Sequence, residues 1–439
     1  MKLIKLSSFL IIDDSTVIQN ALRALLSRIG VPTNNISCCP TAGAAVGNCK
    51  RQKFDVLFVD HNLGHGSTGL QMLEQLKLLR LISDNTLIYI VTGNEDPQIE
   101  LAYSDYMPAK YIQKPIRPEE IIKVINHDLI KRQFSTGMIA AYTKDGLAGV
   151  KPLIFQAPNK VILKDSMLKL ASRLIKVNRL QEALSVNKAL LSIIKESIEA
   201  DIQYAEILLA KKEYEQANQH IDGLLQKNKD NLQLIDLKAE VSFARDDIGI
   251  AARFWKRGFE LSPYSYIRFC KLVWSLLAKG EKYDAFDLLT KYAYLLPNSA
   301  FDSAGKRAMA AWGDLYLASE DILQEWSPES AWQRVSAKLK GRLRGIPCIA
   351  AQRALSALFQ LKINRYGEAN RHISDIQIND IADYETAFIV YLVYCEMKLD
   401  DEKAQLEEKW LTKLQKGTST LAQLQTMAFI KQQKSSSSF

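Results

Sequence analysis

The sequence predicts a five-stranded doubly wound parallel sheet, an α/β domain, followed by an all-α domain of helical repeats. Two observations support this prediction. From the N-terminus to about residue 130, short apolar runs alternate with amphipathic stretches, as in parallel sheets covered by helices on both faces. Beyond residue 160, alanines recur with a 34-residue period, which is typical of helical repeats. A chain of 439 residues also exceeds what one core usually holds, so at least two domains are expected.

The predicted strands and helices alternate regularly through the first domain. The strands are 9–12, 36–38, 56–59, 87–91 and 111–112. The helices are 16–29, 41–49, 70–81, 97–103 and 118–131. Pro97 and Pro118 each fall where proline suits the first turn of a helix. The N-terminal MKLIKLSSFLIIDDS is interpreted as the first strand rather than a cleaved signal, because Asp13 and Asp14 interrupt its apolar run.

Polar residues follow four of these strands where they end. Asp13 and Asp14 follow the first, Asp60 the third and Thr92 the fourth, and Lys114 follows the fifth. Ligands of open parallel sheets bind at the carboxyl ends of the strands, so we expect these side chains to converge. Three carboxylates in one crevice repel each other unless a cation neutralises them, and oxygen ligands of this kind suit Mg²⁺.

These positions resemble the receiver domains of bacterial response regulators of the chemotaxis CheY type, which have a flavodoxin-like fold. The resemblance covers about 130 residues and rests on five chemical positions in the right order. It implies that Asp60 accepts a phosphoryl group from a phosphohistidine, with Lys114 balancing the phosphoryl charge. The Mg²⁺ ligands it implies are Asp13 (through water), Asp14, Asp60 and the backbone carbonyl of Asn62.

The resemblance also implies a conformational switch. Thr92 would move toward the acyl phosphate while Tyr111 rotates inward, and Asn62 and Asn94 lie near positions that tune dephosphorylation. The segment after Asp60, DHNLGHGSTGL, departs from the family pattern: Gly64 replaces a proline, and the glycine at position 69 comes one residue late. That departure leaves the phosphoryl lifetime open.

Plainer interpretations of the same residues stay open. An aspartate at a strand end can be a helix cap, Thr92-Gly93-Asn94 can be an ordinary turn, and Tyr111 can be a half-buried sheet residue. His61 and His65 flank the site and could bind a metal, although loop histidines are more often solvated. A receiver that never accepts phosphate is a further alternative.

The remainder of the chain is predicted to be helical after a linker. Residues 134–160 lose periodicity, and their glycines and prolines indicate loops, although 138–142 could extend the preceding helix. The 34-residue spacing relates three sets of residues: Ala183, Ala217, Ala251 and Ala285; Ala171, Ala205 and Ala239; Pro263 and Pro297. Small residues let paired helices approach closely, and a late proline ends the second helix. Leu174, Leu208 and Leu276 are further expected packing residues.

This spacing is similar to that of the tetratricopeptide repeat (TPR). Four units are readable between about 166 and 296, the register is lost between Ala300 and Gly345, a unit resumes around Ala357 and Ala369, and a weaker one lies near Ala404. An irregular helical bundle is the alternative. The resemblance implies a surface that binds another protein. The predicted domains are therefore a receiver at 1–133, a linker at 134–160, repeats at 161–430 and a disordered tail at 431–439.

Composition constrains the possible partners. The formal charge of +8 is modest for this length and does not by itself indicate nucleic acid. The densest basic stretch, from Arg334 to Arg344, is interpreted as a solvated helix face, with a nucleic-acid-binding effector as the alternative. Six cysteines without a CxxC pair indicate neither zinc nor a disulfide framework and favour the cytoplasm. No run of about 18 uncharged apolar residues occurs, so no membrane span is expected.

Together these features predict a response regulator of a two-component phosphorelay. A sensor histidine kinase or phosphotransfer protein would phosphorylate Asp60 with Mg²⁺ as cofactor, and the TPR-like array would bind a protein partner. The alternative is a phosphate sink or modulator that binds a sensor kinase or a sister regulator. No enzymatic activity is expected beyond self-phosphorylation and self-dephosphorylation, and a homodimer through the receiver is possible on either interpretation.

Overall fold

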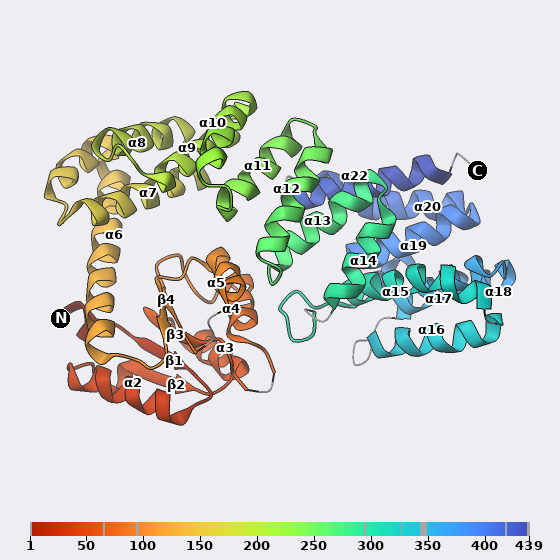
Figure 1. Ribbon diagram of the computed structural model, residues 1–439, viewed down its shortest axis with the longest axis horizontal. Helices are drawn as coiled ribbons and strands as arrows, with labels where there is room; N and C mark the ends of the chain where they lie inside the picture. The colour runs from red at the N-terminus through yellow and green to blue at the C-terminus, as the bar shows by residue number, and fades with distance from the viewer. Residues whose placement is uncertain are drawn as a thin grey trace. The chain divides into compact units, whose positions relative to one another are not determined.

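The computed structural model describes residues 2–64, 66–93, 96–293, 296–325, 327–342, 349–417 and 419–436. It divides into two compact units, Met1–Asp247 (unit 1) and Ile248–Phe439 (unit 2), and each is described by itself. Unit 1 starts with a sheet domain and continues into helical hairpins, whereas the described part of unit 2 is helical (Figure 1). No helix in the described residues is long and apolar enough to cross a membrane.

The sheet has five parallel strands, as predicted, and their order is β2-β1-β3-β4-β5. Its strands are β1 (Phe9–Ile12), β2 (Ile36–Cys39), β3 (Val56–Asp60), β4 (Leu87–Thr92) and β5 (Lys110–Gln113). Asp60 pairs in register with Val91, and Thr92 pairs with Gln113. Because all five strands run in the same direction, the residues that follow them gather at one edge of the sheet.

The helices around the sheet match the predicted alternation. They are α1 (Lys2–Leu6), α2 (Thr16–Arg28), α3 (Ala42–Arg51), α4 (Gly69–Leu78), α5 (Pro97–Tyr103) and α6 (Pro118–Gln156), with 3₁₀ turns η1 (Thr33–Asn35) and η2 (Ser104–Tyr106). The interpretation of the N-terminus as part of a strand is wrong for 2–6. These residues are helical, and Ile4 is fully buried in the core of the sheet domain. Burial of Ile4 gives this short helix the tertiary support that its length alone does not provide.

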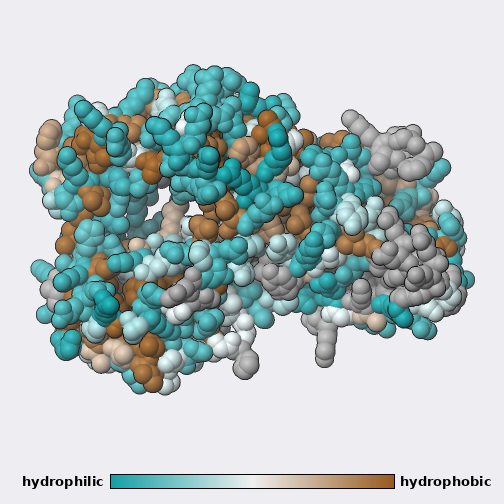
Figure 2. Space-filling model, viewed as in Figure 1, coloured by the Kyte–Doolittle hydropathy of each residue, from teal (hydrophilic) through white to brown (hydrophobic). Residues whose placement is uncertain are grey.

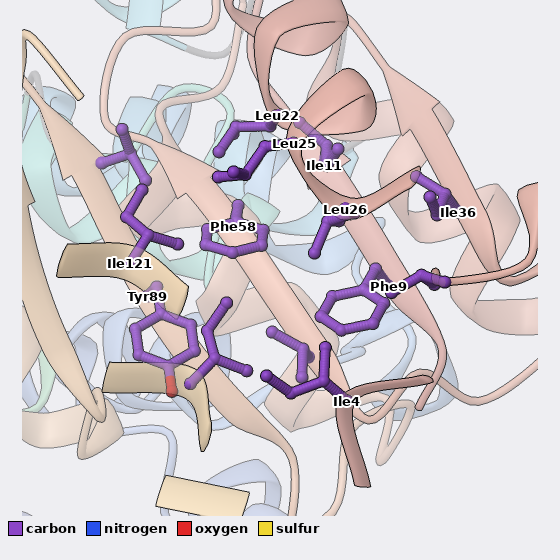
Figure 3. Close-up of a cluster of buried hydrophobic side chains, with 14 of the residues drawn as sticks. Ile4, Phe9, Ile11, Leu22, Leu25, Leu26, Ile36, Phe58, Tyr89 and Ile121 are labelled. Carbon is purple, nitrogen blue, oxygen red and sulfur yellow. The ribbon is translucent and has the colours of Figure 1, made fainter. Parts of the chain in front are cut away.

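The core of one sheet face lies between the strands and helices α2 and α6. Alternate strand residues such as Phe9, Phe58 and Tyr89 meet Leu22 of α2 and Ile121 of α6 (Figure 3). The intervening residues, Leu10, Leu57 and Ile90 among them, are also buried. Because side chains alternate between the two faces of the sheet, burial of both sets means that both faces of the sheet are covered. The sheet therefore holds the loops at its edge in position.

Helix α6 continues well past the predicted end of the first domain. It spans 39 residues, and Gly146 interrupts it with φ of 60° and ψ of −146°. The prediction of a loop-rich linker at 134–160 is therefore wrong for 134–156. Met138 and Tyr142 are buried against the helices that follow, and this burial favours helix where the glycines and Pro152 suggested loops. Within α6, Gly146 is the one residue with a positive φ, a backbone conformation that residues other than glycine rarely take.

Helical hairpins follow α6 in unit 1. Their helices are α7 (Lys160–Lys176), α8 (Leu180–Ile193), α9 (Ile198–Ala210), α10 (Tyr214–Lys227) and α11 (Leu232–Ala244). The alanines expected at close helix contacts are buried, and Ala171, Ala183, Ala205 and Ala217 are each 0% exposed. Hydrophilic side chains cover much of the visible face of α8 to α10 (Figure 2), so the apolar stripes of these helices face inward.

The 34-residue period is repeated in the backbone of the turns. Asn178, Lys212, Asp246 and Gly280, which follow one another at this period, all have positive φ, between 59° and 87°. In each turn the next amide donates to the carbonyl five positions earlier, for example Glu213 to Leu208 at 2.9 Å. This pattern is the Schellman motif that ends a helix. The equally spaced residues Asn364 and Lys398 also have positive φ.

Unit 2 contains further helices. They are α12 (Ile248–Leu261), α13 (Tyr266–Lys279), α14 (Lys282–Tyr292), α15 (Ala304–Glu325), α16 (Pro328–Arg342), α17 (Ile349–Lys362), α18 (Tyr366–Ser374), α19 (Tyr384–Met397), α20 (Asp400–Leu406), α21 (Thr412–Gln415) and α22 (Thr420–Ser436), with a 3₁₀ turn η4 (Ile378–Asp380) and a π-helical turn η5 (Glu407–Leu411). Where the 34-residue register is lost, α15 has 22 residues and is longer than the repeat helices.

The C-terminal segment differs from the prediction. A disordered tail was expected from residue 431, but α22 continues to Ser436. Gln432 is 3% exposed, and with Leu424, Gln425, Ala428 and Phe429 it forms one buried stripe at helical spacing. Packing of this stripe accounts for the continued helix. Residues 437–439 lie outside the described part of the chain.

Candidate functional site

Three carboxylates meet at the carboxyl edge of the sheet, as the strand ends predicted. One oxygen from each of Asp13, Asp14 and Asp60 lies within 4.8 Å of the others. Asp13 and Asp60 are 2% and 5% exposed, whereas Asp14 is exposed to solvent. The cluster therefore has two buried acids and one at its mouth.

Lys114 joins the two buried acids. Its Nζ lies 2.8 Å from Asp60 Oδ2 and 2.9 Å from Asp13 Oδ2, and 23% of its side chain is exposed. It is placed there by the loop after β5, whose Lys114–Pro115 peptide bond is cis and whose Lys114 amide donates to the Thr92 carbonyl at 3.0 Å. Burial opposes the charge of Lys114, but its hydrogen bonds to Asp60 and Asp13 outweigh burial and raise its pKa.

The single positive charge of Lys114 does not neutralise the three carboxylates of the cluster. Burial raises the pKa of Asp60, and the nearby Asp13 raises it further, although Lys114 and the Asn62 amide act to lower it. Asp13 Oδ2 is buried and, apart from its ion pair with Lys114, has no hydrogen-bond donor. Asp13 Oδ1 accepts from the Ser15 amide at 2.8 Å, which fixes the carboxylate. The residues present thus fit a hard divalent cation with oxygen ligands, such as Mg²⁺.

The loop after Asp60 is closed by Gly69. The Gly69 amide donates to the His61 carbonyl at 2.8 Å, and Thr68 with Gln71 forms a capping box at the start of α4. A Cβ at position 69 would lie 2.1 Å from the Asp60 carbonyl oxygen. The glycine noted as one residue late is therefore the one that packs on the backbone of Asp60.

The other predicted residues are near this edge but not all of them touch the acids. Thr92 is the half-buried last residue of β4, beside β5. The hydroxyl of Tyr111 donates to the Glu100 carbonyl at 2.6 Å. Asn62 directs its backbone N–H to the Asp60 carboxylate. His65 and Asn94 lie outside the described residues.

His61 is not the solvated loop residue that was expected. Its Nδ1 lies 3.0 Å from the hydroxyl of Tyr103, which is 0% exposed, and burial lowers the pKa of His61. Nothing in the sequence indicated this contact, because the two residues are 42 positions apart and Tyr103 reads as an ordinary apolar helix residue. The two form the part of the site that sequence reasoning missed.

The basic stretch in unit 2 is partly neutralised. Arg342 Nε lies 2.7 Å from Asp314 Oδ2, while Arg334 is exposed. Arg344 lies outside the described residues. The arginine that ends α16 is therefore engaged in an ion pair within the unit, which weakens the nucleic-acid alternative.

The fold and the acidic edge define a class: the sheet and its flanking helices form a flavodoxin-like receiver. Residues 9–126 match the family described as response regulator receiver domain. This match supports a role in two-component signalling and implies a phosphodonor partner such as a histidine kinase.

Several solved structures are similar to part of the chain. Chemotaxis protein CheY4 of Vibrio cholerae is 20% identical, with 28% of this chain and 97% of that chain covered and a TM-score of 0.25. A CheY-like receiver domain protein of Methanospirillum hungatei is 23% identical, with 29% and 96% covered and a TM-score of 0.27. NtrX of Brucella abortus, in complex with ADP, is 22% identical, with 30% and 28% covered and a TM-score of 0.26. No curated protein matches the chain.

Proposed function

We propose that the protein is a response regulator whose Asp60 accepts a phosphoryl group from a sensor histidine kinase or phosphotransfer protein, and whose helical hairpins bind a protein partner. The observation that carries the proposal is the contact of Lys114 Nζ with both Asp60 and Asp13, at 2.8 and 2.9 Å, inside a cluster of three carboxylates. Such a cluster combines a nucleophile, a fixed cation and ligands for a metal ion.

The chemistry is a transfer of one phosphoryl group. An oxygen of Asp60 attacks phosphorus, the new P–O bond forms, and the bond from phosphorus to the donor's imidazole nitrogen breaks with its electron pair returning to the ring. Asp13, Asp14, Asp60 and the Asn62 carbonyl are the residues that would hold Mg²⁺, which supplies charge neutralisation to the phosphoryl oxygens. Lys114 stays protonated, as its raised pKa indicates, and balances the charge of the acyl phosphate.

The product acts through residues next to the site. Thr92, at the end of β4, hydrogen-bonds the acyl phosphate, and Tyr111 leaves the Glu100 carbonyl to which its hydroxyl now donates. Phosphorylation thereby shifts a population between two states of β5 and its neighbours rather than building a new fold.

The output is a protein interaction through an array of the tetratricopeptide type. Support comes from turns that share one backbone conformation at the 34-residue period, at Asn178, Lys212, Asp246 and Gly280, and from buried alanines at the same period. Arrays of this kind stack helical pairs and present side chains to a peptide or helix.

The test is phosphorylation of the full chain by acetyl phosphate with Mg²⁺, followed by intact mass. We expect one added phosphoryl group in the wild type and none in Asp60→Asn or with excess chelator. Asp55→Asn is the matched control, because Asp55 is bound by Ser8 and Arg132 at the opposite edge of the sheet. A wild-type protein that stays unmodified, with candidate kinases as donors too, would refute the proposal.

The proposed binding of a protein partner by the helical hairpins is tested separately. Capture of proteins by phosphorylated wild type and by Asp60→Asn should differ in at least one bound protein, and that difference should disappear when the helical hairpins are disrupted. If phosphorylated wild type and Asp60→Asn capture the same proteins, phosphorylation does not control partner binding.

A further inference from the structure

A chain of three aromatic side chains runs from the phosphoacceptor strand to β5. His61, directly after Asp60, meets Tyr103 edge to face, with ring centroids 5.8 Å apart and planes at 76°. Tyr103 meets Tyr111 in the same way, with centroids 6.2 Å apart and planes at 74°. The three residues come from the end of β3, from α5 and from β5, which are otherwise separate elements.

The hydroxyl of Tyr103 is bound to the segment that carries Asp60. It lies 3.0 Å from His61 Nδ1, and either group can donate according to the tautomer of the imidazole. It also lies against the backbone of this segment, since a Cβ on Gly69 would be 2.9 Å from that hydroxyl and 2.1 Å from the Asp60 carbonyl oxygen. Tyr103 is completely buried, so a lost hydrogen bond here is not replaced by water.

Helix α5 holds both ends of the connection to β5. Tyr103, its last residue, contacts His61, and Glu100, three positions earlier and one turn away, accepts the Tyr111 hydroxyl at 2.6 Å. A displacement of the Asp60 segment that moves Tyr103 therefore also moves the acceptor of Tyr111. The contact of the two tyrosine rings gives a second, direct connection.

We propose that Tyr103 is a positioning residue which, through its hydrogen bond to His61, transmits the state of the Asp60 segment to Tyr111 by way of α5. The inference rests on the proposed function, because it requires that Asp60 changes state. It adds a route that does not pass through Thr92 and assigns a role to the side chains of His61 and Tyr103.

The experiment measures amide hydrogen exchange over Lys110–Gln113 in the full chain, before and after acetyl phosphate with Mg²⁺. Exchange is corrected for the phosphorylated fraction from intact mass, so differences in the extent of phosphorylation do not enter. The variants are Tyr103→Phe and His61→Leu, which remove the hydrogen bond, and His61→Asn, whose amide can approach the position of Nδ1. Tyr89→Phe is the control, because it also removes a buried hydroxyl, bound to Asp128 at 2.8 Å.

In the wild type, phosphorylation should change exchange at Lys110–Gln113. In Tyr103→Phe and His61→Leu we expect that change to fall about 5-fold, the effect of one ordinary hydrogen bond on an equilibrium, while His61→Asn and Tyr89→Phe retain it. The retained response of His61→Asn separates a positioning role from mere loss of packing.

Four results would overturn the inference. Tyr103→Phe could respond like the wild type, or Tyr89→Phe could lose as much of the response as Tyr103→Phe does. A phosphorylated wild-type chain could also show no change in hydrogen exchange at Lys110–Gln113. That result would refute the inference but not the phosphorylation of Asp60. A wild-type chain that accepts no phosphoryl group would refute both the inference and the proposed phosphorylation of Asp60.

Discussion

Gly69 provides the sharpest test of the site geometry. Substitution by alanine adds a Cβ that would lie 2.1 Å from the Asp60 carbonyl oxygen and 2.9 Å from both the Tyr103 hydroxyl and Val59 Cγ1. Rotation of a side chain cannot relieve the first contact, because the oxygen belongs to the backbone. Carbon and oxygen need more than about 3 Å, so the Asp60 peptide or the start of α4 must move by about 1 Å.

That movement should lower both the stability of the protein and its rate of phosphorylation. Overpacking of this kind costs about 1–3 kcal/mol of stability. A displacement of about 1 Å at a reacting group typically slows the reaction about 100-fold. Asp60 Oδ2 lies 2.8 Å from Lys114 Nζ, so a shift of that size would lengthen this contact beyond hydrogen-bonding distance. Gly69→Ala should therefore be phosphorylated by acetyl phosphate about 100 times more slowly than the wild type.

The matched control is Gly47→Ala in α3, where an added Cβ meets nothing within 4 Å. Alanine is the better helix former, so this variant should gain about 0.5–1 kcal/mol and keep its phosphorylation rate. The rates are measured by intact mass over time. If Gly69→Ala reacts within about 3-fold of the wild type, the close packing of the late glycine on Asp60 is not what positions the nucleophile, and the geometric reasoning fails.

Three further predictions concern the helical hairpins. Lys212→Gly should raise local stability by about 0.5–1 kcal/mol, because a left-handed lysine is strained and glycine is not; hydrogen exchange of α9 and α10 measures this. Ala217→Leu should cost about 1–3 kcal/mol in urea unfolding, since Ala217 is fully buried, whereas Leu at the exposed Ala404 should be nearly neutral. Burial raises the pKa of Glu385, although Lys306 Nζ lies 3.9 Å from its carboxylate. Because the pKa in the folded state is above the unfolded value of about 4.3, ionisation of this carboxylate lowers the stability of the folded state at pH values above about 4.3. Glu385→Gln should accordingly raise the thermal midpoint at pH 7 and leave it unchanged near pH 4; a lower midpoint at pH 7 would contradict this.

The acidic edge was predictable because it depends on strand direction alone. Once five parallel strands are assigned, Asp13, Asp60 and Lys114 must meet at one edge, and they do. The 34-residue period was likewise readable from alanines, and the structure adds the left-handed turn residue, such as Lys212, that periodicity in composition did not reveal.

What the sequence could not predict depends on contacts between distant residues. The hydrogen bond between His61 and Tyr103 joins positions 42 apart, and neither residue type predicts the other. The helix at 134–156 was missed because local propensity favours loops there, while burial of Met138 and Tyr142 decides otherwise. Tertiary burial, not local sequence, also extends α22 beyond residue 431.

The length of α6 changes how a signal can leave the receiver. Its first turns pack in the core of the sheet domain through Ile121 and Ile125, and further along it Ser135 hydrogen-bonds Ser166 of α7 at 2.7 Å. A flexible linker would absorb a small displacement of β5 and α6, but a helix shared by both domains transmits it until Gly146 interrupts the helix. Phosphorylation of Asp60 would therefore act on the first hairpin through continuous helix, and changes at α7 should accompany those at β5.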